Sequence, residues 1–260
     1  MNNSFNPREY WEKRLRSSFD LQGTGHHRFD LEYNKWLYHA QRDCMDDLVN
    51  KYKFTVSGKR IIDIGSGTGF YLEYYQSYQP ASLTGMDITQ CSIEYLKKKF
   101  PEGHFIQHDI SDQFLPPKDA FDIISAMGVL YHIIDDNKFT QAVTNLCDML
   151  VPEGYLLISD AFNEPFFPSA RHAHFRGLKS YQPILEAHQI KIIHTIPLYY
   201  FLNRSFIPFI GSRIIKTFRL GKPLYHLDRI LRSFALSNFG NLKILLAQKF
   251  YGEIGGNKRG

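Results

Sequence analysis

The sequence predicts an α/β fold in which a mostly parallel sheet is covered by helices on both faces. Short apolar runs of strand length alternate with segments long enough to form a helix, and this alternation is typical of parallel sheets. The runs are residues 60–64, 82–86, 104–107, 121–126 and 155–159, followed after a gap by 191–201 and 242–250. Ligands of such sheets bind beyond the carboxyl ends of the strands, so the loops there are where a site is expected.

The composition fits one globular domain, alone or with an appended lid. Of the 260 residues, 43% are hydrophobic and 22% are charged, which excludes a disordered tail, a collagen-like chain and a disulfide miniprotein. The net charge of +5 averages two unlike parts, because residues 1–170 carry −7 and residues 171–260 carry +12. The basic last third therefore needs its own explanation.

The first part of the chain is predicted to be an N-terminal helical flap, residues 1–53. A charged helix is expected over 8–16, where Pro7 is tolerated in the first turn, and a long amphipathic helix over 30–52. Between them, residues 17–27 contain the run Gly-Thr-Gly-His-His and are expected to form a loop. This flap would cover a site on the main domain.

The main domain is predicted to comprise residues 54–202 and 241–252, with an inserted helical lid at 203–240. Within the insert, apolar residues recur at helical spacing over 206–220 and 224–234, and arginine and lysine occupy the other side. Such helices could pack as a lid, contact an anionic membrane surface peripherally, or receive an acidic substrate. The pattern leaves these roles open.

The cysteines and the chain start indicate a cytoplasmic protein. Cys44, Cys91 and Cys147 are an odd number and form no CxxC or Cys/His cluster, so they are expected to be inert, mostly buried thiols in a reducing compartment. Residues 1–7 show no signal-peptide pattern. Polar residues interrupt the apolar stretch 195–215, which is therefore not expected to span a membrane.

A glycine-rich turn is the strongest chemical signal. Gly65, Gly67 and Gly69 follow the first buried strand, so backbone N–H groups and a helix N-terminus can approach a ligand closely. The spacing is G-x-G-x-G, which differs from the G-x-G-x-x-G of dinucleotide enzymes. Asp63 precedes the first glycine and could accept a hydrogen bond from an amino group of a ligand.

Further acids close the next two strands. Asp87, followed by Ile88, ends the second strand, where a carboxylate can accept hydrogen bonds from ribose hydroxyls. Asp109, followed by Ile110, lies at the end of the third strand, within reach of an adenine amino group. Together with the glycine turn, these acids predict a nucleoside-binding edge.

Residues 60–160 resemble the class I S-adenosylmethionine-dependent methyltransferases. The segments that carry the resemblance are IIDIGSGTGF, TGMDIT, QHDISD, FDIISAMGVLYHI and LVPEGYLLISD, in the family's order. The resemblance implies a Rossmann-like seven-stranded sheet with an antiparallel last strand and S-adenosylmethionine as cofactor, which leaves as S-adenosylhomocysteine. It also implies that the glycine turn faces the methionine moiety, that Asp87 binds the ribose and Asp109 the adenine, and that Ala126 and Met127 line the cofactor through their backbone.

The candidate catalytic residues follow the fourth strand. His132 is the best candidate for a general base because an imidazole can take a proton from a hydroxyl or ammonium group, and Tyr131 is a weaker candidate. His172 and His174 could approach a substrate or a metal, but a solvent-exposed loop is the simpler interpretation. Oxygen ligands are too few for a metal, since only Asp160 and Asn163 are nearby, so we expect a metal-independent enzyme.

The predicted activity is methyl transfer to oxygen, or to nitrogen, of a small aromatic or lipophilic metabolite such as a natural product. The 21 Phe, 16 Tyr and 2 Trp residues suit aromatic pocket walls. An Asn/Asp-Pro-Pro-aromatic motif is missing after the fourth strand, which makes a nucleic acid a less favoured acceptor. The alternatives are an RNA methyltransferase that uses the basic last third and a non-catalytic module that binds S-adenosylmethionine. The sequence does not indicate an oligomeric state.

Overall fold

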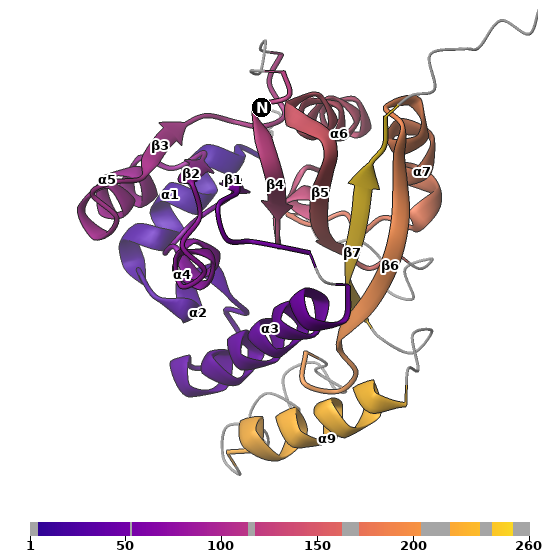
Figure 1. The fold of residues 1–260 in the computed structure, drawn as a ribbon. Coiled ribbons are helices and arrows are strands. Elements are labelled where there is room, and N and C mark those ends of the chain that lie inside the picture. The colour runs from indigo at the N-terminus through magenta and orange to yellow at the C-terminus, as the bar shows by residue number, and fades with distance from the viewer. Residues whose placement is uncertain are drawn as a thin grey trace, which may run out of the picture.

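The computed structural model describes residues 5–52, 54–113, 118–162, 172–203, 219–234 and 241–251. Its centre is a seven-stranded sheet of order β3-β2-β1-β4-β5-β7-β6 (Figure 1). The strands are β1 (Arg60–Ile64), β2 (Ser82–Asp87), β3 (His104–Gln107), β4 (Phe121–Ala126), β5 (Leu150–Asp160), β6 (Ile190–Tyr199) and β7 (Leu242–Lys249). The helices after the first strand are α4 (Phe70–Gln76), α5 (Gln90–Lys99), the short 3-10 turn η1 (Leu130–His132), α6 (Asp136–Met149) and α7 (Leu178–Ala187).

The pairing of the strands confirms the predicted sheet. Strands β1 to β5 pair in parallel, whereas β7 runs antiparallel to both β5 and β6. Most predicted strand positions agree with the structure, but β5 begins earlier than expected, at Leu150, because Leu150 already pairs with Phe121 across an irregularity in the ladder. The carboxyl ends of β1, β2 and β4 therefore lie side by side, which brings the glycine turn, Asp87 and Met127 to one edge.

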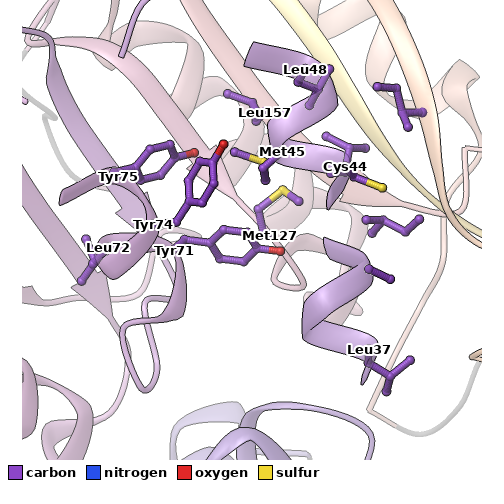
Figure 2. Close-up of a cluster of buried hydrophobic side chains, with 14 of the residues drawn as sticks. Leu37, Cys44, Met45, Leu48, Tyr71, Leu72, Tyr74, Tyr75, Met127 and Leu157 are labelled. Carbon is purple, nitrogen blue, oxygen red and sulfur yellow. The ribbon is translucent and has the colours of Figure 1, made fainter. Parts of the chain in front are cut away.

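Both faces of the sheet are buried, which explains the continuous apolar runs of its strands. Along β1, Ile61 belongs to a core shared with the N-terminal long helix and α4, while Ile62 and Ile64 belong to a second core shared with α6 and α7. Figure 2 shows the first of these cores, in which tyrosines of α4 face Met45 and Leu48. The sheet is thus held rigidly between two helical layers.

The predicted flap forms α1 (Pro7–Ser17), α2 (Leu21–Thr24) and α3 (Leu31–Tyr52). The expectation of a loop over residues 17–27 was wrong in part, because α2 lies within it. Asp20 is responsible: its side chain accepts from the backbone N–H groups of Gln22 and Gly23, which caps this short helix.

The described part of the inserted segment is the helix α9 (Gly221–Ser233), which packs along α3 at the periphery (Figure 1). Tyr225 contacts the Trp36 ring and donates a hydrogen bond to Asp43 of α3 at 2.7 Å. Within the range 224–234, whose apolar residues were expected on one helix face, Leu227 and Phe234 are exposed, and the buried residues of α9 include Tyr225 and Asp228. Most of the first predicted helix of the insert, 206–220, lies outside the described residues.

The cysteines are free, as predicted, and two of them are buried. Burial raises the pKa of the Cys44 and Cys147 thiols to about 12, so both stay protonated and unreactive at neutral pH. Cys91 is partly exposed. Within the described residues, no helix has the length and apolar character needed to cross a membrane.

Candidate active site

The glycine turn between β1 and α4 adopts a backbone that only glycine accommodates without strain. Gly65, Gly67 and Gly69 have φ angles of 70°, 50° and 81°. A Cβ on Gly65 would collide with the Val129 side chain, and one on Gly67 would lie 2.8 Å from the Thr24 methyl group. The turn is therefore pressed between the segment after β4 and the flap helix α2.

Asp87, at the end of β2, holds this turn in place. Its Oδ2 accepts from the Gly67 backbone N–H at 2.8 Å, and its Oδ1 accepts from the Thr89 backbone N–H at 2.8 Å and hydroxyl at 2.7 Å. Burial raises the pKa of Asp87, and these donors oppose the rise. A carboxylate has about four lone-pair sites, so Asp87 keeps capacity for about one more donor, such as a ribose hydroxyl.

Asp109 lies in the loop that follows β3. Its Oδ1 accepts from both the Ser111 backbone N–H at 2.9 Å and the Ser111 hydroxyl at 2.7 Å. This turn fixes the carboxylate and leaves Oδ2 without a hydrogen-bond donor among the described residues. That oxygen is suited to accept from an amino group of a ligand.

A cavity of about 1520 Å³ brings most of the predicted site residues together. Its lining includes Gly65, Gly67, Asp87, Ile88, Asp109, Ile110, Met127, Tyr131 and His132. A nucleoside that carries an amino-acid group needs three things from such a site. The glycine turn, which has no Cβ atoms, allows close approach, Asp87 can accept a hydrogen bond from a ribose hydroxyl, and Oδ2 of Asp109 can accept one from an amino group. The residues present therefore fit S-adenosylmethionine.

Three predicted cofactor residues do not line the cavity. Asp63 is fully buried beneath the turn and accepts from the Ser125 hydroxyl at 2.6 Å, and burial raises its pKa to about 7. Gly69 packs against the side chains of α5, and Ala126 is enclosed within β4. These residues shape the turn from behind, and the direct contact predicted between Asp63 and a ligand amino group is not available in this arrangement.

His132, in η1 after β4, is fixed in one tautomer. Its Nδ1 lies 2.8 Å from the backbone carbonyl oxygen of His172, and because a carbonyl only accepts, Nδ1 carries the proton of the neutral ring. Nε2 is then the acceptor. Burial, together with nearby Arg14, lowers the pKa of His132 to about 4 despite the carbonyl contact, so at neutral pH the ring is uncharged and Nε2 can take a proton.

Aromatic rings surround His132. Trp11 of α1 meets it edge-on at 4.8 Å between ring centroids, and Tyr131 lies at 4.5 Å. Tyr131 in turn contacts Phe175 at 4.7 Å, and burial raises the pKa of Tyr131 above its ordinary value. Tyr131 therefore keeps its proton and forms part of the apolar wall.

No group of three or more potential metal ligands occurs among the described residues. Asp160, considered at first as an oxygen ligand, is buried and accepts from the backbone N–H groups of Ala161 and Arg176 and from the Tyr181 hydroxyl. Asn163, the other candidate, lies outside the described residues. His172 lines the cavity and stacks on His132, whereas the simpler expectation placed it in an exposed loop.

The cations of the cavity are residues that the sequence did not single out. Arg14 of α1 and Arg28 before α3 line it, together with Lys138 of α6. Among the described arginines and lysines of the basic last third, none lines the cavity. The positive charge that lines the cavity therefore comes from the two flap arginines and from Lys138. In the sequence, this was indicated only by the density of arginine and histidine in the flap.

The comparison with protein families gives a match over residues 36–200 to the family described as "Methyltransferase domain". Among curated proteins, a tRNA U34 carboxymethyltransferase of Stutzerimonas stutzeri (strain A1501) is 29% identical over 132 residues, which are 47% of this chain and 40% of that protein. A protein of the same name from Syntrophotalea carbinolica is 32% identical over 109 residues, which are 40% of this chain and 32% of that protein. The chain thus spans well under two thirds of these relatives.

Solved structures share the fold at low sequence identity. Magnesium protoporphyrin IX methyltransferase from Synechocystis PCC 6803, solved with bound SAM, matches with a TM-score of 0.61 and 13% identity, covering 96% of this chain and 100% of that one. N-methyltransferase NodS from Bradyrhizobium japonicum WM9, solved with S-adenosylhomocysteine, matches with a TM-score of 0.61 and 15% identity, covering 94% and 99%. At such identities these likenesses establish the fold alone.

Proposed function

The chain belongs to the methyltransferase domain family and is an S-adenosylmethionine-dependent methyltransferase, and we propose that it methylates an oxygen, or a nitrogen, of a small aromatic or lipophilic metabolite. One observation carries the proposal. One cavity is lined by the glycine turn, Asp87 and Asp109 and also by His132 and aromatic side chains. A nucleoside cofactor and a planar acceptor are the ligands that suit this combination.

When bound, S-adenosylmethionine supplies a methyl group on a positively charged sulfur, which a nucleophile can attack directly. Because the donor is already activated, the protein mainly has to align the reactants, exclude water and take up the acceptor's proton. Asp87 and the glycine turn hold the nucleoside, and Trp11 and Tyr131 shield the reacting end from water. Nε2 of His132 accepts the proton of the acceptor's hydroxyl or ammonium group.

The proposal is tested in two steps with the full chain. Titration calorimetry with S-adenosylmethionine and S-adenosylhomocysteine should show one site per chain. Transfer of a labelled methyl group should then be detected to a member of a panel of phenols, hydroxybenzoates and amines, or to a small-molecule extract fraction. Absence of cofactor binding would overturn the proposal at its root, and binding without transfer to any acceptor would favour a non-catalytic module.

A second candidate, methylation of RNA, is favoured by one observation. The matched curated relatives are named as enzymes of tRNA. Against it, some cations of the last third are already paired: Arg176 with Asp136 at 2.8 Å and Lys249 with Asp119 at 3.1 Å. Retention of the chain on tRNA at about 150 mM salt, with a steep loss of affinity as salt rises, would favour this candidate over the small-molecule one.

A further inference from the structure

Two arginines, which carry the positive charge, and three histidines form a group at the flap side of the cavity. This flap cluster consists of Arg14, His26, His27, Arg28 and His172, all of which line the cavity. The rings of His27 and His172 lie 6.5 Å apart, so the cluster joins the flap to the segment that precedes α7. Burial lowers the pKa of each of its histidines, and the charges of Arg14 and Arg28 lower it further.

No carboxylate compensates these charges within the part of the chain that the structure describes. The Arg14 guanidinium donates to the backbone carbonyl oxygens of Gly25 at 2.5 Å and Gln22 at 3.4 Å, and to the Tyr10 hydroxyl at 3.3 Å. These neutral acceptors orient the guanidinium but leave its charge uncancelled. Arg28 is exposed and forms no ion pair with a described residue.

Arginines elsewhere in the molecule show the contrast. Arg176 pairs with Asp136 at 2.8 Å and Arg60 pairs with Asp122 at 3.0 Å. The acids that line the cavity are Asp87, Asp109 and Asp135, which belong to the sheet edge and to the start of α6. The flap cluster is therefore a place where a ligand, and not the protein, has to supply the negative charge.

We propose that the methyl acceptor carries an anionic oxygen group, a carboxylate or a phosphate monoester, which binds the flap cluster. The fork of N–H donors on arginine matches both groups, and each neutral histidine ring can add one N–H donor. His132 lies next to the cluster, with its ring centroid 5.9 Å from that of His172. An acceptor held by its anion would thus present its remaining part beside the proton-accepting ring. This inference rests on the proposed function and narrows its substrate class.

The test titrates the chain, saturated with S-adenosylhomocysteine, with matched pairs of probes in a calorimeter. One pair is 4-hydroxybenzoate and its neutral counterpart 4-hydroxybenzamide, and the other is phenyl phosphate and phenol. We expect one of the two anions to bind at least about tenfold more tightly than its neutral counterpart, and the tighter anion identifies the group. Arg28→Gln should weaken that anion about tenfold, because it removes a charge-assisted contact at an exposed position where folding is not at stake.

Lys13→Gln is the matched control, because Lys13 is an exposed cation of α1 that does not line the cavity. It should leave anion binding unchanged. Equal affinity for anionic and neutral probes, no binding of either anion, or equal losses in the two variants would overturn the inference. The inference would also be overturned if Arg28→Gln weakened the binding of S-adenosylhomocysteine but not that of 5′-methylthioadenosine. The second compound lacks the amino-acid part of the first, so this result would show that Arg28 binds the cofactor's carboxylate. Failure to bind S-adenosylhomocysteine at all would instead overturn the proposed function.

Discussion

Two parts of the cavity lining differ in the sign of their charge and in how they are built: the cofactor end, with the glycine turn, Asp87 and Asp109, and the flap end, with the flap cluster and His132. At the cofactor end, Asp87 and Asp109 are held by backbone N–H groups and hydroxyls in the loops after β2 and β3. At the flap end, the flap cluster carries arginine and histidine with no described carboxylate beside them. On the proposals above, the acids would serve the cofactor and the flap cluster would bind the anionic group of the acceptor.

The largest effect is expected at the flap end. His132→Ala should lower kcat by about 10²–10⁴-fold, because it removes the acceptor for the proton, while the Kd for S-adenosylhomocysteine stays unchanged. Steady-state turnover and calorimetry measure the two quantities separately. His104→Ala, at an exposed position of β3 outside the cavity, is the control and should change neither. If His132→Ala weakened cofactor binding as much as it lowered turnover, His132 would contribute to cofactor binding, and the two ends would not have separate functions.

A substitution in the glycine turn tests how rigid the cofactor end is. Gly65→Ala should lower the free energy of unfolding by about 2–4 kcal/mol and abolish detectable cofactor binding, since it adds both a strained φ and a collision with Val129. Gly58→Ala is the matched control, because Gly58 has a φ of 69° but no atom within 4 Å of the added Cβ. It should cost only about 1 kcal/mol. Urea unfolding measures both, and equal costs would mean that the Val129 contact is unimportant.

Asp87→Ala should affect the cofactor end alone. We expect a loss of about 1.5–3 kcal/mol in the binding of S-adenosylhomocysteine, because the carboxylate both holds the Gly67 N–H and retains acceptor capacity for the ribose. Calorimetry measures this loss, and the anion titration described above is the control. If anion affinity fell as much as cofactor affinity, the two ends would be coupled and not separate.

The last prediction concerns Asp63 and the pH dependence of stability. Its pKa, raised by burial to about 7 from 3.8, means that the native chain holds a proton that the unfolded chain has released over this range. The free energy of unfolding therefore falls through this group as pH rises from about 4 to about 7. Asp63→Asn keeps an acceptor for Ser125 and removes the titration, so the variant should gain stability relative to the wild type as pH rises.

Urea unfolding of both proteins across this pH range measures the difference. His26 and His132, with pKa values lowered to about 4, contribute the opposite slope up to about pH 6.5. They are present in both proteins, so their contribution cancels. A stability difference that does not change with pH would show that Asp63 is ionised throughout.

The cofactor end was largely predictable from the sequence because its parts are local. Apolar runs define the strands, and the glycine turn, Asp87 and Asp109 directly follow strands that pair as neighbours. The family's order of segments added the cofactor. Asp63 is the exception, since its partner Ser125 lies on another strand and nothing in the local pattern distinguishes a buried acid from one that faces a ligand.

The flap end was not predictable in the same way because it is assembled by tertiary packing. Arg14 and Arg28 reach the cavity only through the docking of α1, α2 and α3, and no spacing in the sequence indicates this. The net charge of +12 in the last third suggested that its arginines and lysines face the ligand, but the described ones do not line the cavity. Helix α9, for example, packs on α3 through the hydrogen bond from Tyr225 to Asp43. Net charge by segment does not show which charges converge.

Thr24 of the flap lies so close to Gly67 that a Cβ on Gly67 would meet its methyl group, and this packing links the flap to the cofactor turn. The affinity for S-adenosylhomocysteine therefore also depends on how well the flap is docked against the turn. A substitution in α1 or α2 that loosens this docking would register as a cofactor defect although it touches no atom of the cofactor. Variants of the flap should therefore be ranked by anion and cofactor affinity together, since a parallel decline of both identifies undocking and a selective decline identifies a binding residue.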